Sequence, residues 1–205
     1  MRYPIFSIFL LVALLLSATS SYGQVSGQTG SNSFLTGQLL IAKDSMRDPR
    51  FAKTVILMIQ HDQHGAMGLV VNKPVGEGPL AKLMEGFGIQ SEGAEGTVRL
   101  YYGGPVDRRI GFVIHSPEYR RPGTRTINSV ASITTHPKVF RDIADEKGPK
   151  KKIFTMGYTG WGAGQLEREL ARDNWLVAPA KEALIFSQDV SSVWDWARVK
   201  AGLPL

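Results

Sequence analysis

Residues 153–169 read IFTMGYTGWGAGQLERE, and the architecture of the chain depends on how this stretch folds. An apolar run from Ile153 to Met156 has the length of a strand. Four glycines follow it, and Leu166 and Leu170 then recur at helical spacing. The order of strand, glycine-rich loop and helix is typical of a phosphate-binding loop. Phosphate binding is therefore the first function to test.

The glycine spacing argues against phosphate binding. A dinucleotide fingerprint needs G-x-G-x-x-G, whereas Gly160, Gly162 and Gly164 give G-x-G-x-G. The Lys-Ser/Thr pair that ends a P-loop is absent after the last glycine. Glu167 and Glu169 would stand in the first turn of the helix, where they complement its positive end and repel a phosphate. The phosphate-binding interpretation is therefore disfavoured.

A second interpretation treats the glycines as a tight corner. Glu167 would then cap its own helix, and Tyr158 and Trp161 would form an aromatic wall beside Gln165 and Glu167. Clefts in α/β sheets commonly form at such strand ends. We therefore predict a binding groove at this corner, for a peptide segment or a small polar ligand, with the indole open to that ligand.

Working outward, the remaining patterns predict a single α/β (α+β) domain with a mixed sheet flanked by helices. We expect strands at 39–42, 55–59, 67–71, 98–102, 111–115 and 153–156, and helices at 79–87, from 136, after 164 and from about 191. Thr135 can cap the second helix, and the last one should bury Val193, Trp196 and Ala197 and stop at Gly202 before Pro204. The runs at 55–59 and 67–71 are apolar throughout, so both faces of the sheet should be covered there.

The first 33 residues do not resemble a folded domain. Residues 1–23 carry Arg2, an apolar block and then small residues, the order of a secretory signal or, if uncleaved, of an N-terminal anchor. Residues 24–33 are polar, rich in Gly and Ser, and predict a flexible linker to the domain at 34–205. The expected location is the periplasm or the exterior if the signal is genuine, and the cytoplasm if the start is misassigned. Contact with a membrane is expected only through an uncleaved N-terminal segment.

Composition narrows the chemistry. The 205 residues include no cysteine, which excludes thiolate catalysis, disulfides and cysteine metal sites. The net charge of +6 is spread over short runs such as residues 150–152, which we interpret as solvated strand ends. Nucleic acid is therefore an open but less favoured partner.

The histidines give no strong catalytic pattern. His61, Asp62 and His64 fit a solvated turn better than a metal site. No Gly-x-Ser-x-Gly elbow accompanies His115, and no pair of carboxylates forms a dyad. We therefore assign no catalytic residue and expect no metal and no cofactor.

Four stretches together resemble the YqgE/AlgH family of bacterial proteins: residues 35–74 (LTGQLLIAKDSMRDPRFAKTVILMIQHDQHGAMGLVVNKP), 101–106 (YYGGPV), 157–170 (GYTGWGAGQLEREL) and 174–186 (NWLVAPAKEALIF). The resemblance covers the chain from Phe34 onward and implies a compact AlgH-like domain without an assigned reaction. Its signature positions mark a candidate surface for a ligand or partner: Asn72, Pro74, Gly103, Gly104, Pro105, Gly157, Gly160, Trp161, Gln165 and Glu167.

Three functional hypotheses follow. The first and favoured one is a non-enzymatic binding or regulatory protein that recognises a protein segment or a small ligand. The second is a hydrolase-type enzyme that uses His115 or His61 with a nearby acid. The third, implied by the family resemblance, is a transcription-associated regulator of exopolysaccharide genes.

Overall fold

The computed structural model describes residues 34–201, which belong to one compact unit. The expected signal segment and linker at 1–33, and the helix stop at Gly202 and Pro204, lie outside the described residues. Between residues 34 and 201, no helix is long and apolar enough to cross a membrane.

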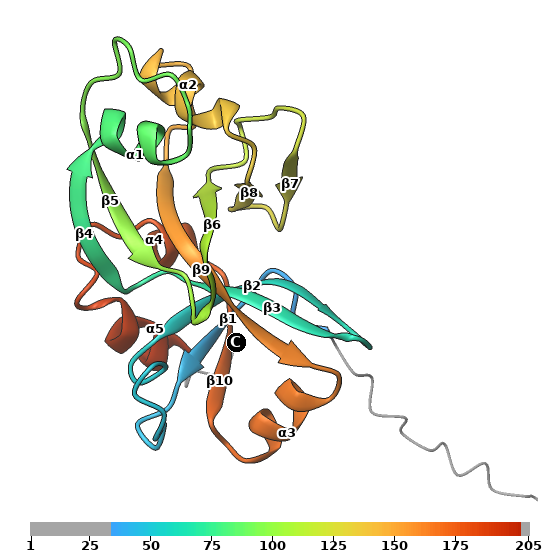
Figure 1. The fold of residues 1–205 in the computed structure, drawn as a ribbon. Coiled ribbons are helices and arrows are strands. Elements are labelled where there is room, and N and C mark those ends of the chain that lie inside the picture. The colour runs from blue at the N-terminus through green and yellow to red at the C-terminus, as the bar shows by residue number, and fades with distance from the viewer. Residues whose placement is uncertain (1–33, 202–205) are drawn as a thin grey trace, which may run out of the picture. The chain divides into compact units, whose positions relative to one another are not determined.

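Ten strands and five helices follow one another along the described chain (Figure 1). The strands are β1 (Gln38–Ala42), β2 (Val55–Asp62), β3 (Gly65–Val70), β4 (Pro74–Pro79), β5 (Thr97–Tyr102), β6 (Val106–His115), β7 (Thr124–Thr126), β8 (Ser132–Thr134), β9 (Lys152–Gly162) and β10 (Trp175–Pro179). The helices are α1 (Leu80–Gly86), α2 (Lys138–Ala144), α3 (Gln165–Ala171), α4 (Glu182–Ile185) and α5 (Val193–Ala201).

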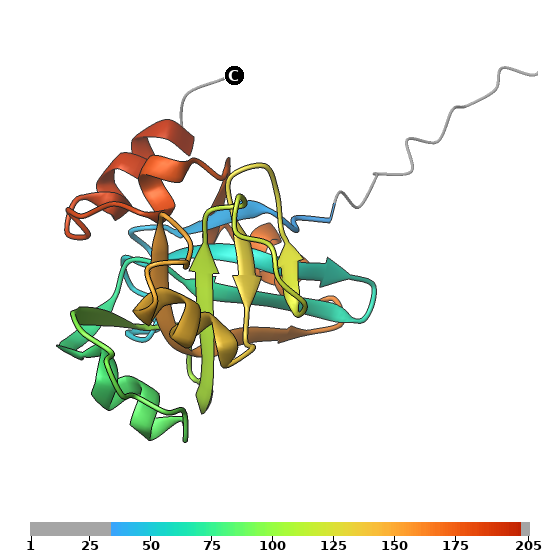
Figure 2. The same ribbon diagram turned by 90° about the horizontal axis from the view of Figure 1, so that it is seen from above.

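The long strand β9 organises the sheet. The strand order is β10-β1-β2-β3-β9-β6-β8-β7, with antiparallel neighbours throughout this path. The first half of β9 lies between β6 and the parallel strand β5, whose free side pairs with β4. The second half of β9, from Thr159 to Gly162, pairs with β3. The result is a mixed sheet curled around β9, with helices on its outside (Figure 2).

Three glycines allow the chain to cross β9. Because β5 and β6 flank opposite edges of β9, the connection between them must pass across that strand. A Cβ at Gly103 would lie 2.2 Å from the Gly157 carbonyl oxygen, and one at Gly104 would lie 2.1 Å from the Tyr158 carbonyl carbon. Gly157 has φ +74°, and its own Cβ would meet the Gly104 carbonyl oxygen at 2.6 Å. The two backbones therefore touch directly, which only glycine permits.

The apolar strands are covered on both faces, as their composition predicts. In β1 and β2, alternate side chains enter two different clusters: Leu39 and Leu57 pack toward α4 and α5, whereas Leu40 and Ile56 pack toward α3. A third cluster lies under α1 and α2 and includes Phe154. The mixed sheet and the single α+β domain expected from the sequence are thus confirmed.

Several local expectations are wrong. Residues 157–162 continue β9 rather than forming a glycine loop, so only Ala163 and Gly164 turn the chain into α3. Thr135 does not cap α2 with its side chain. On α5 the buried indole is Trp194, at 5% exposure, whereas Trp196 is 47% exposed. The strands β4, β7, β8 and β10 and the short helix α4 add to the predicted set.

Candidate functional site

The corner between β9 and α3 is held by one carboxylate. The Glu169 Oε2 atom accepts hydrogen bonds from the indole Nε1 atoms of Trp161, at 3.0 Å, and Trp175, at 2.9 Å. The Gln165 amide donates to the other oxygen at 3.0 Å. The two indoles meet edge to face with centroids 6.1 Å apart. We call these four residues the indole clasp. Because indole N–H groups need a partner when they are buried, the clasp stabilises the corner.

The clasp corrects the expectation of an open indole. Trp161 is only 7% exposed and packs in the cluster behind α3, while Gln165 is exposed. The amide oxygen of Gln165 accepts from the Gly162 N–H at 3.2 Å, so this side chain also closes the turn before α3. Trp161 is therefore a core residue of the corner and not a wall open to a ligand.

Glu167 lies in the first turn of α3, as predicted, and is also paired with a buried histidine. The His61 Nε2 and Glu167 Oε1 atoms are 2.8 Å apart. The Leu35 N–H donates to the His61 Nδ1 atom at 3.0 Å, so Nε2 is the nitrogen that carries the hydrogen toward Glu167. The pKa of Glu167 lies below its ordinary value, first because its own backbone N–H donates to the carboxylate and then because of His61, while desolvation opposes the shift.

The remaining signature residues have structural roles or lie at the surface. The Asn72 amide accepts from the Val55 N–H at 2.8 Å and donates to the Lys53 carbonyl at 2.9 Å, which supports a turn where Lys53 has φ +56°. Pro105 ends the crossing made by the three glycines described above, and Gly160 lies in β9 opposite Met67. Pro74 is exposed at the start of β4. Their role in ligand or partner binding stays a prediction.

The two buried histidines, His61 and His115, are held in place by hydrogen bonds. Both ring nitrogens of His61 are engaged, and its side chain is 4% exposed. His115 is fully buried, donates from Nδ1 to the Ser116 carbonyl at 2.9 Å, and has its pKa lowered chiefly by burial. Tyr119 packs against it, and burial together with the Asp142 contact raises the pKa of this tyrosine to about 12. Within residues 34–201, no group of three His, Asp or Glu side chains is placed to hold a metal.

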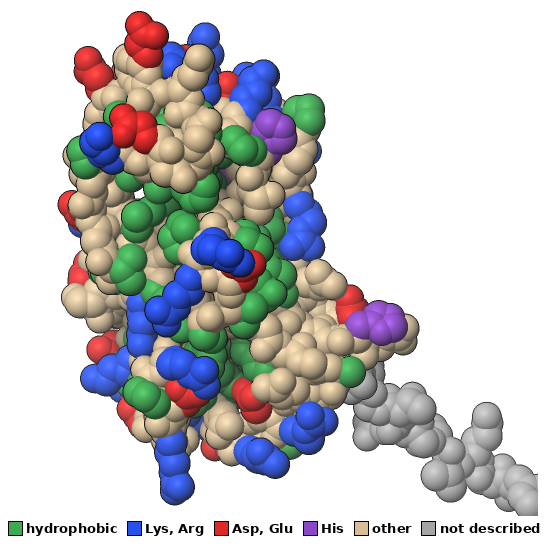
Figure 3. All heavy atoms as spheres, in the orientation of Figure 1, with side chains coloured by type: hydrophobic (Ala, Val, Ile, Leu, Met, Phe, Trp, Pro, Cys, Tyr) green, Lys and Arg blue, Asp and Glu red, His purple; other side chains and the backbone are tan. Residues whose placement is uncertain are grey.

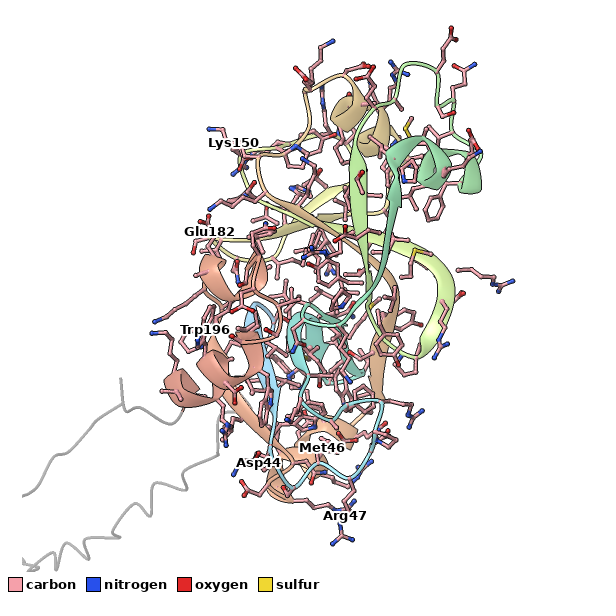
Figure 4. The ribbon with its side chains drawn as sticks, turned by 90° about the vertical axis from the view of Figure 1, so that its left-hand side faces the viewer. Asp44, Met46, Arg47, Lys150, Glu182 and Trp196 are labelled. Atoms are coloured by element: carbon pink, nitrogen blue, oxygen red, sulfur yellow. The ribbon has the colours of Figure 1, made fainter. Side chains whose placement is uncertain are left out.

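A polar pocket of about 550 Å³ opens beside the indole clasp. Its walls come from α3, from Trp175 and from the loop between β1 and β2, whose tip carries Met46 and Arg47 (Figure 4). Arg50 in this loop is paired with Asp48 at 2.6 Å. Several polar groups of this pocket, namely those of Asp48, Arg50, Gln165 and Glu169, are thus paired within it.

A second concave surface differs sharply in chemistry. This apolar groove, of about 650 Å³, is formed by β4, α1, β5, Met156 of β9 and the first residues of β6. Its apolar lining includes Val75, Leu83, Phe87, Leu100 and Met156. Val75 is 63% exposed. Figure 3 shows hydrophobic side chains gathered across the middle of this face, with basic side chains standing in front of them. A concave surface of this volume with a largely apolar lining is a common place for a binding site.

Two of the basic side chains at the groove come from a bulge in β6, and the third is Lys82 of α1. The register with β9 shifts between Val106 and Gly111, and Asp107 takes φ +35°, so residues 107–110 leave the regular ladder. The Arg108 guanidinium lies 5.5 Å from the centre of the Tyr102 ring. Arg109 is 93% exposed along its side chain and approaches Asp107 at 3.5 Å. No sequence motif predicts this groove, because its residues come from five separate segments.

The fold and these two concave surfaces define a class: a small α+β domain curled around one long strand, with an open apolar groove on its surface. An AlgH-like family model matches residues 39–205. A UPF0301 protein of Methylococcus capsulatus is 45% identical over 170 residues, which cover 83% of this chain and 93% of the relative. One from Jannaschia is 44% identical and covers 80% and 86%. The chain belongs to the AlgH-like family.

Solved structures agree with this assignment. The solution structure of the AlgH protein from Pseudomonas aeruginosa matches with a TM-score of 0.70 and 35% identity, over 85% of this chain and 92% of that one. A crystal structure from Corynebacterium diphtheriae matches with a TM-score of 0.66, over 83% and 88%. At 20% identity, the second match supports the fold alone.

Proposed function

We propose that this chain is a non-enzymatic binding protein that recognises a segment of a partner protein through the apolar groove. The observation that carries the proposal is the groove itself, with Val75 of β4 63% exposed beside Leu83 and Met156. Exposure of this apolar surface to water is unfavourable in free energy, because burial of apolar area is favourable. A partner segment in the groove would remove it from water.

The proposal places the binding site on a different surface from the one that the sequence predicts. The corner around Trp161 and Gln165 satisfies its own polar groups through Glu169, and its indole is buried. The groove lies on the same strand but nearer its start, at Met156, and Pro74 stands next to its edge residue Val75. The proposed binding surface therefore lies on the same strand as the predicted one, β9, but at the apolar groove and not at the corner before α3.

The hydrolase alternative has less support. A general base needs a ring nitrogen that can reach the substrate. The His61 nitrogens are held by Leu35 and Glu167, and the free Nε2 atom of His115 is fully buried. The geometry thus favours binding over histidine-dependent hydrolysis.

A photo-crosslinking experiment in the native host tests the proposal. A photoreactive amino acid replaces Val75 in the groove, and in a matched control it replaces Val199 on α5, where the exposed fraction is 62% instead of 63%. We expect a discrete adduct with a partner protein at position 75 and none at 199. The adduct should disappear in the Leu83→Asp background, because a carboxylate in the groove would repel an apolar segment. Equal adducts at both positions would contradict the proposal.

A further inference from the structure

Three glycines line the apolar groove, and a side chain at any of them would meet no other part of the chain. Gly76 and Gly78 lie in β4, and Gly86 is the last residue of α1. None of the three has a positive φ, and a Cβ built on any of them meets no atom within 4 Å. Glycine inside a strand or helix is destabilising relative to alanine. Gly76 stands at a bulge in the pairing of β4 with β5, and Gly86 ends a helix, both positions that glycine suits. For Gly78, no contact within the described part of the chain accounts for the small size.

A backbone approaching from outside would account for it. Glycine in a strand often marks a place where a ligand or another backbone comes close. The contrast with Gly103 and Gly104 is direct, since at those positions a Cβ would collide with β9 of the same chain. At Gly76 and Gly78 the space that a Cβ would fill is open, and it faces the groove or its edge.

Some charged side chains around the groove have a partner of opposite charge, and others do not. Lys82 is paired with Glu85 at 2.8 Å, and Glu77 accepts a hydrogen bond from Arg99. Arg108, by contrast, forms no ion pair with any carboxylate of residues 34–201, and Arg109 has only the 3.5 Å contact with Asp107. The charge left over at the groove is thus positive, and it sits on the bulge of β6 that stands beside the apolar lining.

We infer that the occupant of the groove is an acidic, apolar peptide segment of a partner protein. Its backbone approaches at Gly76, Gly78 and Gly86, its apolar side chains lie on Leu83 and Met156, and its carboxylates pair with the two arginines of the bulge. Arginine suits this role because its planar group can bind a carboxylate through two hydrogen bonds. The inference rests on the proposed function and adds the chemistry of the partner.

The test uses a phage-displayed library of random twelve-residue peptides, selected against the full chain. We expect enriched peptides that combine apolar residues with Asp or Glu. One enriched peptide is then labelled, and its affinity for each variant is measured by fluorescence anisotropy. The Arg108→Ala/Arg109→Ala double variant should bind it at least about tenfold more weakly, as loss of two charge-assisted contacts predicts. A peptide with Asn and Gln in place of its acids should bind wild type and double variant alike.

A second arm tests the glycines with a variant that cannot fail by unfolding. Gly86→Ala should raise the melting temperature, because alanine favours helix and its Cβ meets nothing. The same variant should weaken peptide binding at least about tenfold, since the new methyl group occupies the path of the peptide backbone. The matched control, Val199→Ala on α5, should change neither the affinity nor the melting temperature by much.

The outcomes separate the two proposals. If no peptide is enriched relative to a Leu83→Asp selection, peptide recognition by the groove is wrong, and the proposed function falls with it. Peptides enriched without acidic residues would leave the proposed function standing and overturn the inference about charge. Unchanged affinity in Gly86→Ala would overturn the backbone approach. A concentration-dependent dimer that Leu83→Asp abolishes would replace the partner segment by a second copy of this chain.

Discussion

The indole clasp and the apolar groove lie five residues apart on one strand, at Trp161 and Met156 of β9. They differ in whether their side chains have partners within the chain. In the clasp, each indole N–H and the Gln165 amide find an acceptor on Glu169. In the groove, Val75 remains exposed, and Arg108 has no described carboxylate partner. The aromatic, glycine-rich motif thus stabilises the fold, whereas the groove leaves an apolar side chain and a positive charge at the surface.

The crossing at Gly157 separates these two regions and should be the least tolerant point of the chain. Gly104→Ala would place a Cβ 2.1 Å from the Tyr158 carbonyl carbon, at a residue with φ +155°. Because backbone atoms on both sides would have to move, we expect a loss of at least about 3 kcal/mol in the free energy of unfolding. Urea unfolding followed by circular dichroism measures it. Gly76→Ala is the control, since its Cβ meets nothing. Equal stability of the two variants would show that β9 is not crossed as described.

The clasp gives the next largest effect. Glu169→Ala leaves two buried indole N–H groups without an acceptor, and we expect the free energy of unfolding to fall by about 2–4 kcal/mol. Glu169→Gln keeps one acceptor oxygen and should cost about 1 kcal/mol. Thermal unfolding and the near-ultraviolet signal of the indoles report the change.

The groove supplies the matched comparison for this prediction. Arg108→Ala removes an exposed side chain that lies over the Tyr102 ring and forms no ion pair with a described carboxylate, so stability should stay within about 0.5 kcal/mol of wild type. If Glu169→Ala were equally harmless, the corner would not be closed by its carboxylate, and the contrast between the two regions would fail.

The sequence predicts the apolar strands and most helices because their signals are local. Runs such as 55–59 and 67–71 are apolar at each position, and the structure covers both of their faces. The strand β4, sequence PVGEGP, carries prolines and glycines that are depleted in strands, so its pairing with β5 could not be predicted from propensity.

The glycines were misleading for a physical reason. In residues 157–162 they look like a loop, because glycine is the residue of tight turns. The structure uses Gly157 for a crossing of two backbones that are more than 50 residues apart in the sequence, and a local pattern carries no information about such a contact. The same limit applies to α5, where helical spacing alone could not tell that Trp194 rather than Trp196 faces the sheet.

The candidate site was predictable only in part. The motif around Trp161, Gln165 and Glu167 predicts a ligand groove with an open indole, whereas the structure buries Trp161 against Trp175 of β10 and pairs Glu167 with His61 of β2. The groove gave no signal, because exposure of Val75 and the β6 bulge at Asp107 depend on tertiary packing. The sequence shows that Arg108 and Arg109 form a basic pair, but it does not show that an apolar groove lies beside them.

The smallest expected effect concerns the pH dependence of the corner. The pKa of Glu167 is lowered below its ordinary value of 4.5, first by its own backbone N–H and then by His61. A carboxyl whose pKa is lower in the folded state contributes stability above its unfolded pKa, and this contribution is lost as the pH falls through the folded pKa. Wild type should therefore melt slightly higher than Glu167→Gln at pH 7, and the difference should vanish toward pH 3. The effect is small because the carboxylate is 38% exposed and water screens it.

Arg109→Gln, on the groove side, should show no such convergence between these pH values, since arginine stays charged throughout. A difference between wild type and Glu167→Gln that persisted unchanged to pH 3 would mean that the pair with His61 holds the corner by shape and hydrogen bonding alone, without the charge on Glu167.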